Sequence, residues 1–156
     1  MNTPLPLDKP VLLFYRINDA FGEFSNFSPH PIVLDGVEWP TSEHYFQAQK
    51  FHDHEYRERI RMAIKPMAAA QLGRSRACPI RTDWEAVKDD VMRLAVRVKF
   101  TTYPSLMSLL LSTDNRLLVE QTTDDHYWGC GTSGEGKNML GVILMEIRSE
   151  FRQAHD

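Results

Sequence analysis

Three polar side chains that could do chemistry share one spacing in the run Ser42–Phe51. Glu43, Gln47 and Lys50 stand at positions i, i+4 and i+7, which places them on one face of an α-helix. One interpretation is a solvated face with weak Glu–Lys pairing, worth about 0.2–0.5 kcal/mol per pair. The other is a pocket wall, where a carboxylate acts as acid or base and an amine acts as nucleophile or phosphate ligand. The spacing alone leaves both interpretations open.

A second group of chemically useful residues lies in the segment Asp124–Gly131, which holds two carboxylates, a tryptophan and two glycines. An indole ring is costly to leave in water, so Trp128 must cover either the core or the planar ring of a ligand. In the second case Asp125, or its neighbour Asp124, would lie beside that ligand. Gly134–Asn138 then opens a helix whose N-terminal amides suit an anion, although its spacing matches no phosphate-binding loop.

Two further segments have a structural and a functional interpretation. Gly22–Pro29 places two phenylalanines in a polar loop, which indicates either a packed loop or the rim of a ligand site. Arg74 and Arg76 follow a predicted helix end and are either exposed or a phosphate clamp. His52 and His54 diverge on a helix and have no evident third ligand, so we expect no metal.

The elements that must hold these residues are mostly helical. Periodicity and turn signals predict short strands at residues 11–17, 32–34, 37–39 and 116–121, and helices that begin at Ser42, Asp53, Pro66, Thr82, Pro104 and Met139. Asp35–Gly36 predicts a tight hairpin, Thr82–Glu85 matches a capping box, and Gly73 is expected to stop the third helix. A loop as long as 122–138 is usually functional or disordered. We therefore expect a mainly α (α+β) fold, a compact single-domain helical bundle with a few short antiparallel strands.

Composition narrows the class of protein. The chain has 156 residues, which fits one domain, here expected at residues 11–151 between a loose N-terminal arm, 1–10, and a C-terminal tail, 152–156. Its net charge of -3 argues against a dedicated nucleic-acid binder, which is usually strongly basic. Two cysteines, no signal peptide and no long apolar stretch predict a soluble, cytoplasmic protein in a reducing environment.

Four motifs together resemble the NADAR family of YbiA-like proteins. They are Gly22–Ser28, Trp39–Phe51, the spacing Asp125-x-x-Trp128–Gly129, and Gly136–Gly141. The resemblance extends from Val11 to Phe151, and the run from Glu43 to Phe51 is long and specific. It implies an N-glycosidase that cuts the bond between ribose C1 and an exocyclic nitrogen.

The resemblance implies a role for each candidate residue. Glu43 and Asp125 form the carboxylate pair that stabilises the positive charge developing on the sugar. Lys50 exchanges into an opened aminosugar as a Schiff base, or else contacts the phosphate or ring oxygen. Because a free lysine has a pKa of about 10.4, this role needs burial or a cationic neighbour. The expected substrate-binding residues are Asn26, Phe27, Gln47, Arg74, Trp84, Trp128, Gly129 and Asn138.

Three functions remain as hypotheses. The first is hydrolysis of phosphoribosylamino-pyrimidine intermediates of riboflavin biosynthesis to ribose 5-phosphate and a free aminopyrimidine. The second is the same chemistry on ADP-ribosylated guanine in nucleic acid, which the net charge disfavours because polyanion affinity needs several cationic contacts. The third is a non-catalytic module that binds NAD or ADP-ribose. We expect a monomer that needs no metal or cofactor and contacts no membrane.

Overall fold

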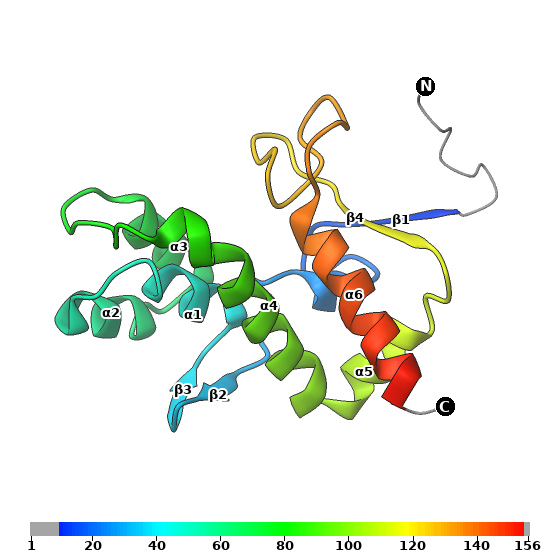
Figure 1. Cartoon of the computed structure of the whole chain (residues 1–156), viewed down its shortest axis with the longest axis horizontal. Coiled ribbons are helices and arrows are strands. Elements are labelled where there is room, and N and C mark those ends of the chain that lie inside the picture. Colours follow the sequence, from blue (N-terminus) through cyan, green and yellow to red (C-terminus); the bar gives the residue numbers. More distant parts are fainter. Residues whose placement is uncertain (1–9, 155–156) are drawn as a thin grey trace. The chain divides into compact units, whose positions relative to one another are not determined.

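The computed structural model describes residues 10–154, which fold as two compact units (Figure 1). The central unit is Asn26–Pro104, and the terminal unit combines the residues up to Ser25 with those from Ser105 onward. Helices predominate and the strands are short, as expected. The expected arm at residues 1–10 lies outside the described residues except for Pro10. None of the described helices has the length and apolar character needed to cross a bilayer.

The terminal unit is built on two strands that pair in parallel. They are β1 (Val11–Phe14) and β4 (Leu117–Glu120). The expectation of antiparallel strands is wrong for this pair. The whole central unit separates the two strands in sequence, so no local turn signal could reveal how they pair.

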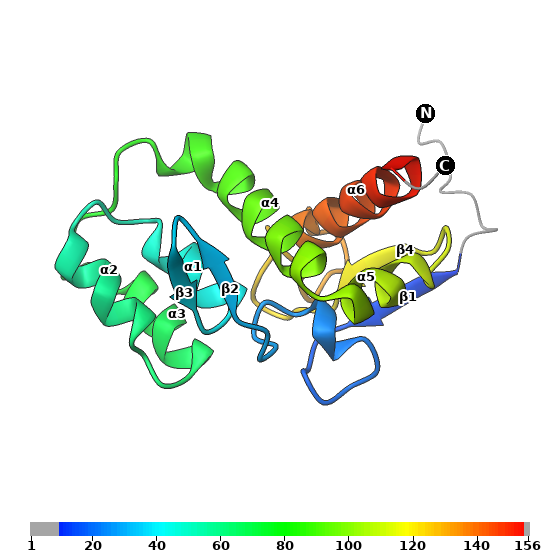
Figure 2. The same ribbon diagram turned by 90° about the horizontal axis from the view of Figure 1, so that it is seen from below.

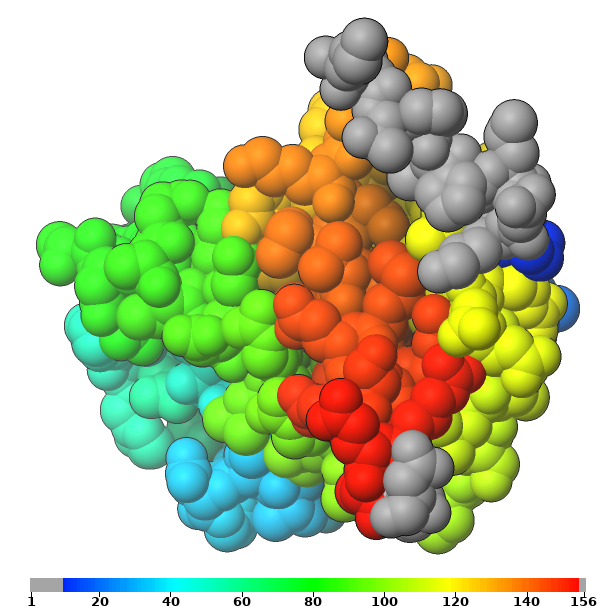
Figure 3. All heavy atoms as spheres, turned by 45° about the vertical axis from the view of Figure 1, so that its right-hand side comes forward, coloured from blue at the N-terminus to red at the C-terminus, as the bar shows by residue number. Residues whose placement is uncertain are grey.

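The other elements of the terminal unit surround these strands. A 3₁₀ turn, η1 (Gly22–Phe24), and α5 (Pro104–Leu111) are followed by α6 (Met139–Ala154), which lies against β4. Figure 3 shows α6, orange to red, beside the yellow segment that carries β4. Because α6 continues to Ala154, the first three residues of the expected tail are helical, and residues 155–156 lie outside the described range.

The central unit opens with a hairpin that confirms the turn prediction. Strands β2 (Ile32–Leu34) and β3 (Val37–Trp39) are antiparallel. Asp35 and Gly36 have φ angles of 54° and 76°, the positive values that a two-residue hairpin turn of this hand requires.

Four helices complete the central unit and pack around the first of them. They are α1 (Ser42–Ala48), α2 (His54–Arg61), α3 (Pro66–Arg74) and α4 (Trp84–Thr102). Helix α1 contacts each of the other three helices (Figure 2). All seven of its residues are buried. The polar face that carries the candidate chemistry is therefore the most enclosed helix surface of this unit.

Side-chain capping bonds fix where two of these helices begin. The hydroxyl of Thr41 accepts from the amide of His44, and the carboxylate of Asp53 accepts from the amide of Tyr56. The capping box expected at Thr82 does not form, because α4 begins one residue later. Its N-cap, Asp83, makes no capping bond and pairs with Arg81 instead.

Candidate active site

The polar face of α1 is buried, which makes the solvated-face interpretation wrong for Glu43 and Gln47; the helix ends at Ala48, so Lys50 lies in the turn after it. Glu43 is 8% exposed and Gln47 is 6% exposed. Gln47 donates from Nε2 to Oε1 of Glu43 over 2.7 Å. Buried polar groups are kept only where hydrogen bonds or ligands compensate their desolvation, so this pair is a built feature of the fold.

Asn26 anchors the start of α1. Its carbonyl oxygen accepts from the Glu43 amide over 3.2 Å, and its Oδ1 accepts from the Ser42 hydroxyl over 2.8 Å. Its Nδ2 donates to the sulfur of Met92 over 3.2 Å. Both ends of the amide are thus engaged, so Asn26 fixes the position of the Glu43 backbone in this structure. Its expected contact with substrate stays a prediction.

His44 ties α1 to the residues that follow α2. Its Nε2 lies 3.0 Å from the Ala63 carbonyl oxygen, and its Nδ1 lies 2.8 Å from the Thr41 hydroxyl. A carbonyl only accepts, so Nε2 carries the proton and the Thr41 hydroxyl donates to Nδ1. Burial lowers the pKa of His44 against the raising effect of the Ala63 bond. The lowered pKa favours the neutral imidazole, and its two hydrogen bonds fix the position of the ring on α1.

Lys50 has the environment that a nucleophilic amine requires. Its side chain is half-buried, and burial is the main cause that lowers its pKa. Glu43 raises that pKa, whereas Arg76 and then Arg74 lower it. Its Nζ lies 5.9 Å from the centroid of the Phe46 ring. The burial and the cationic neighbours that a Schiff-base lysine needs are both present.

The two arginines beyond α3 have different surroundings. Nη1 of Arg76 donates to the carbonyl oxygens of Gly73, Arg74 and Ser75 over 3.1–3.4 Å. Within residues 10–154, the exposed guanidinium of Arg74 forms no hydrogen bond or ion pair. Arg76 therefore closes the end of α3, and Arg74 remains available to an anion.

Phe46 of the central unit lies near the Lys50 amine and packs against Trp84. Trp84 is 7% exposed, and its ring lies 5.1 Å from that of Phe46 between centroids. Phe46 thus contacts the Trp84 ring and the Lys50 amine. Phe27 is half-buried. Trp84 is a packing residue in this structure, and its contact with ligand stays a prediction.

In the terminal unit, Asp125 organises the loop that carries Trp128. Its Oδ1 accepts from the amide of Tyr127 over 3.0 Å and from the amide of Trp128 over 2.8 Å. Thr122 donates from its hydroxyl to the Asp125 carbonyl oxygen over 2.6 Å. The rings of Tyr127 and Trp128 meet edge to face with centroids 4.8 Å apart. Asp125, rather than Asp124, is the carboxylate that fixes this turn.

The long loop at residues 122–138 is folded onto the start of α6. The amides of Asn138, Met139 and Leu140 donate to the carbonyl oxygens of Gly129, Tyr127 and Trp128. These helix N-terminal amides are occupied, so the anion site considered for this segment is not available. A Cβ at Gly129 would overlap the Thr122 side chain and come within 2.9 Å of the Glu120 carbonyl oxygen.

Asn138 joins the same loop to β4. Its Nδ2 donates to the Leu118 carbonyl oxygen over 2.9 Å, and its Oδ1 accepts from the Glu120 amide over 3.0 Å. Its φ angle is 52°, which asparagine adopts more readily than most residues. Asn138 therefore holds the loop in place, and its role as a substrate ligand stays a prediction.

Two other features lie apart from these residues. Among residues 10–154, no group of three His, Cys, Asp or Glu side chains has metal-binding geometry.

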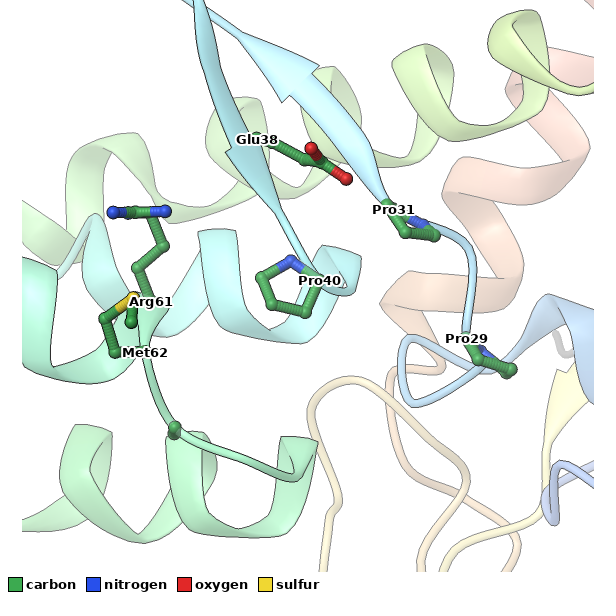
Figure 4. A pocket seen from close by; sticks show the side chains of 7 residues that line it. Pro29, Pro31, Glu38, Pro40, Arg61 and Met62 are labelled. Atoms are coloured by element: carbon green, nitrogen blue, oxygen red, sulfur yellow. The ribbon is translucent and has the colours of Figure 1, made fainter.

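A pocket of about 420 Å³ opens between the end of β3 and the end of α2 (Figure 4). It is lined by Pro29, Pro31, Glu38, Pro40, Arg61, Met62 and Ala63, none of which is a predicted site residue. Its guanidinium, that of Arg61, is already paired with Glu58 over 2.7 Å.

The predicted site residues fall into two sets. The central unit contains Asn26, Phe27, Glu43, Gln47, Lys50, Arg74 and Trp84, and the terminal unit contains Asp125, Trp128, Gly129 and Asn138. Sequence reasoning missed Phe46 beside the Lys50 amine and the effect of Arg76 on its pKa. The i, i+4 spacing of Phe46 and Lys50 was the available signal for the first. Nothing local indicated the second.

Comparison with known proteins gives a consistent result. Residues 13–152 match the family model of the NADAR domain. The chain is 54% identical over 141 residues to N-glycosidase YbiA of Escherichia coli (strain K12), covering 90% of this chain and 88% of that protein. It is 45% identical over 161 residues to the chloroplastic riboflavin biosynthesis protein PYRR of Zea mays, covering 94% of this chain but 26% of that protein. The NMR structure of the E. coli YbiA protein matches it with a TM-score of 0.88 at 51% identity, covering 94% of this chain and 88% of that one.

Proposed function

The chain belongs to the NADAR domain family and is an N-glycosidase, and on this premise we propose that it hydrolyses phosphoribosylamino-pyrimidines. The products are ribose 5-phosphate and a free aminopyrimidine. The observation that carries the proposal is the half-buried Lys50 amine, whose lowered pKa reflects burial and the nearby Arg76 and Arg74, beside the buried Glu43–Gln47 pair.

A lysine amine suits this substrate because the reacting carbon is an aminosugar C1. The sugar ring opens to an imine between C1 and the exocyclic nitrogen. The neutral Nζ of Lys50 adds to C1, and the aminopyrimidine leaves with its nitrogen protonated. Water then hydrolyses the lysine imine, so the overall reaction consumes one water and regenerates the amine.

Glu43 is proposed to move the protons in these steps. Its carboxylate raises the pKa of Lys50, so the two groups interact electrostatically. A carboxylate close to C1 also stabilises positive charge that develops on the sugar. Gln47 donates a hydrogen bond to one oxygen of that carboxylate. This bond keeps the second carboxylate oxygen in a fixed position toward the substrate.

Arg74 is proposed to bind the 5-phosphate. Arginine forms paired hydrogen bonds with phosphate oxygens, and the exposed Arg74 guanidinium is close enough for its charge to lower the pKa of Lys50. Asp125 is proposed as a second catalytic carboxylate and Trp128 as a ring contact, both from the family resemblance. The riboflavin pathway is supported by the name of the maize relative, of which this chain spans about a quarter.

The test is mass-spectrometric detection of ribose 5-phosphate after incubation with an enzymatically generated phosphoribosylamino-pyrimidine. Wild type should release it, and Glu43→Gln should not. Release by both proteins would remove Glu43 from the mechanism. No release by folded wild type would overturn the pyrimidine substrate, and ADP-ribosylated guanine would be tested next. The non-catalytic hypothesis is not retained, because relatives that match about nine-tenths of this chain are named N-glycosidases.

A further inference from the structure

We propose that Gly73 is a positioning residue for the N-glycosidase site, acting on Glu43 through the side chain of Gln47. The proposal rests on Glu43 being the carboxylate of the proposed function. It concerns a residue that the sequence predicted only as the stop of α3. The structure contradicts that expectation, since Gly73 lies inside α3, which ends at Arg74.

The reason for a glycine here is a close approach between two helices. Gly73 is buried where α3 packs against α1. A Cβ at residue 73 would overlap Oε1 of Gln47 and lie 2.7 Å from its Cδ and 3.1 Å from its Cβ. Real Cβ atoms essentially never come within 3.0 Å of another heavy atom, so the Cδ and Oε1 of Gln47 would have to move. The space that any other side chain would fill is thus occupied by the Gln47 amide.

The Gln47 amide is held by little else. Nε2 donates to Glu43, whereas Oε1 is buried and has no hydrogen-bond donor among residues 10–154. A buried acceptor without a donor costs free energy, so the amide would turn away if its neighbours allowed it. The flat surface of Gly73 lets the amide keep the orientation that presents Nε2 to Glu43.

A contact from α2 holds the part of α3 that carries Gly73. Tyr56 donates from its hydroxyl to the Leu72 carbonyl oxygen over 2.5 Å. This bond opposes withdrawal of the Gly73 backbone from an added methyl group. The far end of the Gln47 side chain is the flexible partner and has to move instead.

The first experiment measures Gly73→Ala. Because the group that must move is a flexible side chain, and alanine favours a helix over glycine, we expect this variant to fold. Its kcat should fall about 10–100-fold with KM little changed, as expected for a small displacement of a catalytic group. The acidic limb of its kcat–pH profile should move to higher pH, because a carboxylate that loses a donor is protonated more readily.

The decisive comparison is the double variant Gln47→Ala/Gly73→Ala. Gln47→Ala alone should show the same loss of kcat, and adding Gly73→Ala to it should change kcat less than about twofold, since coupled residues do not act additively. Equal losses from Gly73→Ala in both backgrounds would mean a packing role only and would overturn the proposal. If Gly73→Ala alone does not fold, the double variant must fold and match Gln47→Ala; an unfolded double variant overturns the proposal.

A measurement without substrate separates this proposal from the proposed function. The side-chain amide protons of Gln47, identified in the ¹H–¹⁵N NMR spectrum by their loss in Gln47→Ala, should shift and exchange faster in Gly73→Ala. Gly141→Ala is the matched control, because its Cβ would overlap the Leu118 carbonyl oxygen in the terminal unit. It should lower Tm and leave the Gln47 signals in place. Unmoved Gln47 signals in Gly73→Ala overturn the proposal even if wild type is inactive on the pyrimidine.

Discussion

Gln47 and Glu43 stand one turn apart on α1 and share a hydrogen bond of 2.7 Å, with both side chains at least nine-tenths buried. The bond commits one carboxylate oxygen of Glu43 to a fixed donor. The Lys50 amine lies in the turn that follows α1, and its pKa responds to the Glu43 charge. Helix α1 therefore carries the carboxylate and its positioning amide, and the turn after it carries an amine of lowered pKa.

Replacing Glu43 should separate catalysis from folding. Glu43→Gln keeps the size of the side chain and an oxygen that still accepts from Gln47 Nε2. We expect kcat to fall about 10²–10⁴-fold, the usual contribution of a general acid or base, with Tm nearly unchanged. Steady-state release of ribose 5-phosphate and thermal unfolding measure the two effects. The exposed Glu55→Gln in the first turn of α2 is the control, and full activity in folded Glu43→Gln would contradict the role.

The Lys50 amine should form an imine with the sugar during turnover. Borohydride added during turnover should leave a sugar adduct on Lys50, detected as a mass increase on its peptide, and Lys50→Arg should leave none. Substrate consumption with no adduct on wild type would count against the imine route.

The pH dependence of Lys50 labelling by an amine reagent tests its electrostatics without substrate. Burial, Arg76 and Arg74 lower its pKa, so labelling should reach half its maximum below pH 10.5. Arg74→Gln removes a lowering charge and should move the curve to higher pH. Glu43→Gln removes a raising charge and should move it to lower pH. Shifts in the same direction would refute this assignment.

The two arginines near Lys50 should have distinct effects. Arg74→Gln should raise KM about 10–100-fold with a smaller change in kcat, because a charged hydrogen bond is worth about 1.5–3 kcal/mol. Arg76 donates to three carbonyl oxygens at the end of α3, so Arg76→Gln should lower Tm. Kinetics and thermal unfolding of both variants check this. A rise in KM from Arg76→Gln alone would reverse the assignment of the phosphate ligand.

The catalytic role of the Asp125 charge can be tested separately from the hydrogen bonds by which Asp125 holds the loop. Asp125→Asn keeps an oxygen that accepts from the amides of Tyr127 and Trp128, so Tm should stay near that of wild type. Its kcat should nevertheless fall at least about 10²-fold if the charge is catalytic. Asp125→Ala should lose Tm as well, because two amides lose their acceptor. An active Asp125→Asn would restrict Asp125 to positioning the loop.

His44 should make folding stability depend on pH. Its pKa is lowered in the folded protein, so the unfolded chain binds the proton first. The free energy of unfolding should therefore fall as pH drops below about 6.5, by at most about 1.4 kcal/mol per pH unit, and level off below the folded-state pKa. Denaturant unfolding from pH 8 to 5 measures this slope. His44→Gln should reduce it and the exposed His54→Gln should not; an unchanged slope in His44→Gln would remove His44 as its source.

The sequence predicts the features that depend on residues a few positions apart. These are the Asp35–Gly36 turn, the start of α1 after Thr41, the Asp53 cap and the common face of Glu43 and Gln47, whereas Lys50 lies in the turn beyond the helix. Turn dihedrals, capping bonds and the helical repeat are local, so residue type and spacing are sufficient to predict them. The family motifs lie in the same local runs.

Contacts between distant segments depend on the three-dimensional fold. The parallel pairing of β1 with β4 and the approach of Gly73 to Gln47 both join residues far apart in the chain. The same holds for the burial of Glu43 and for the lowered pKa of Lys50. Desolvation and Coulomb interactions depend on distance in space, which no pattern along the sequence records.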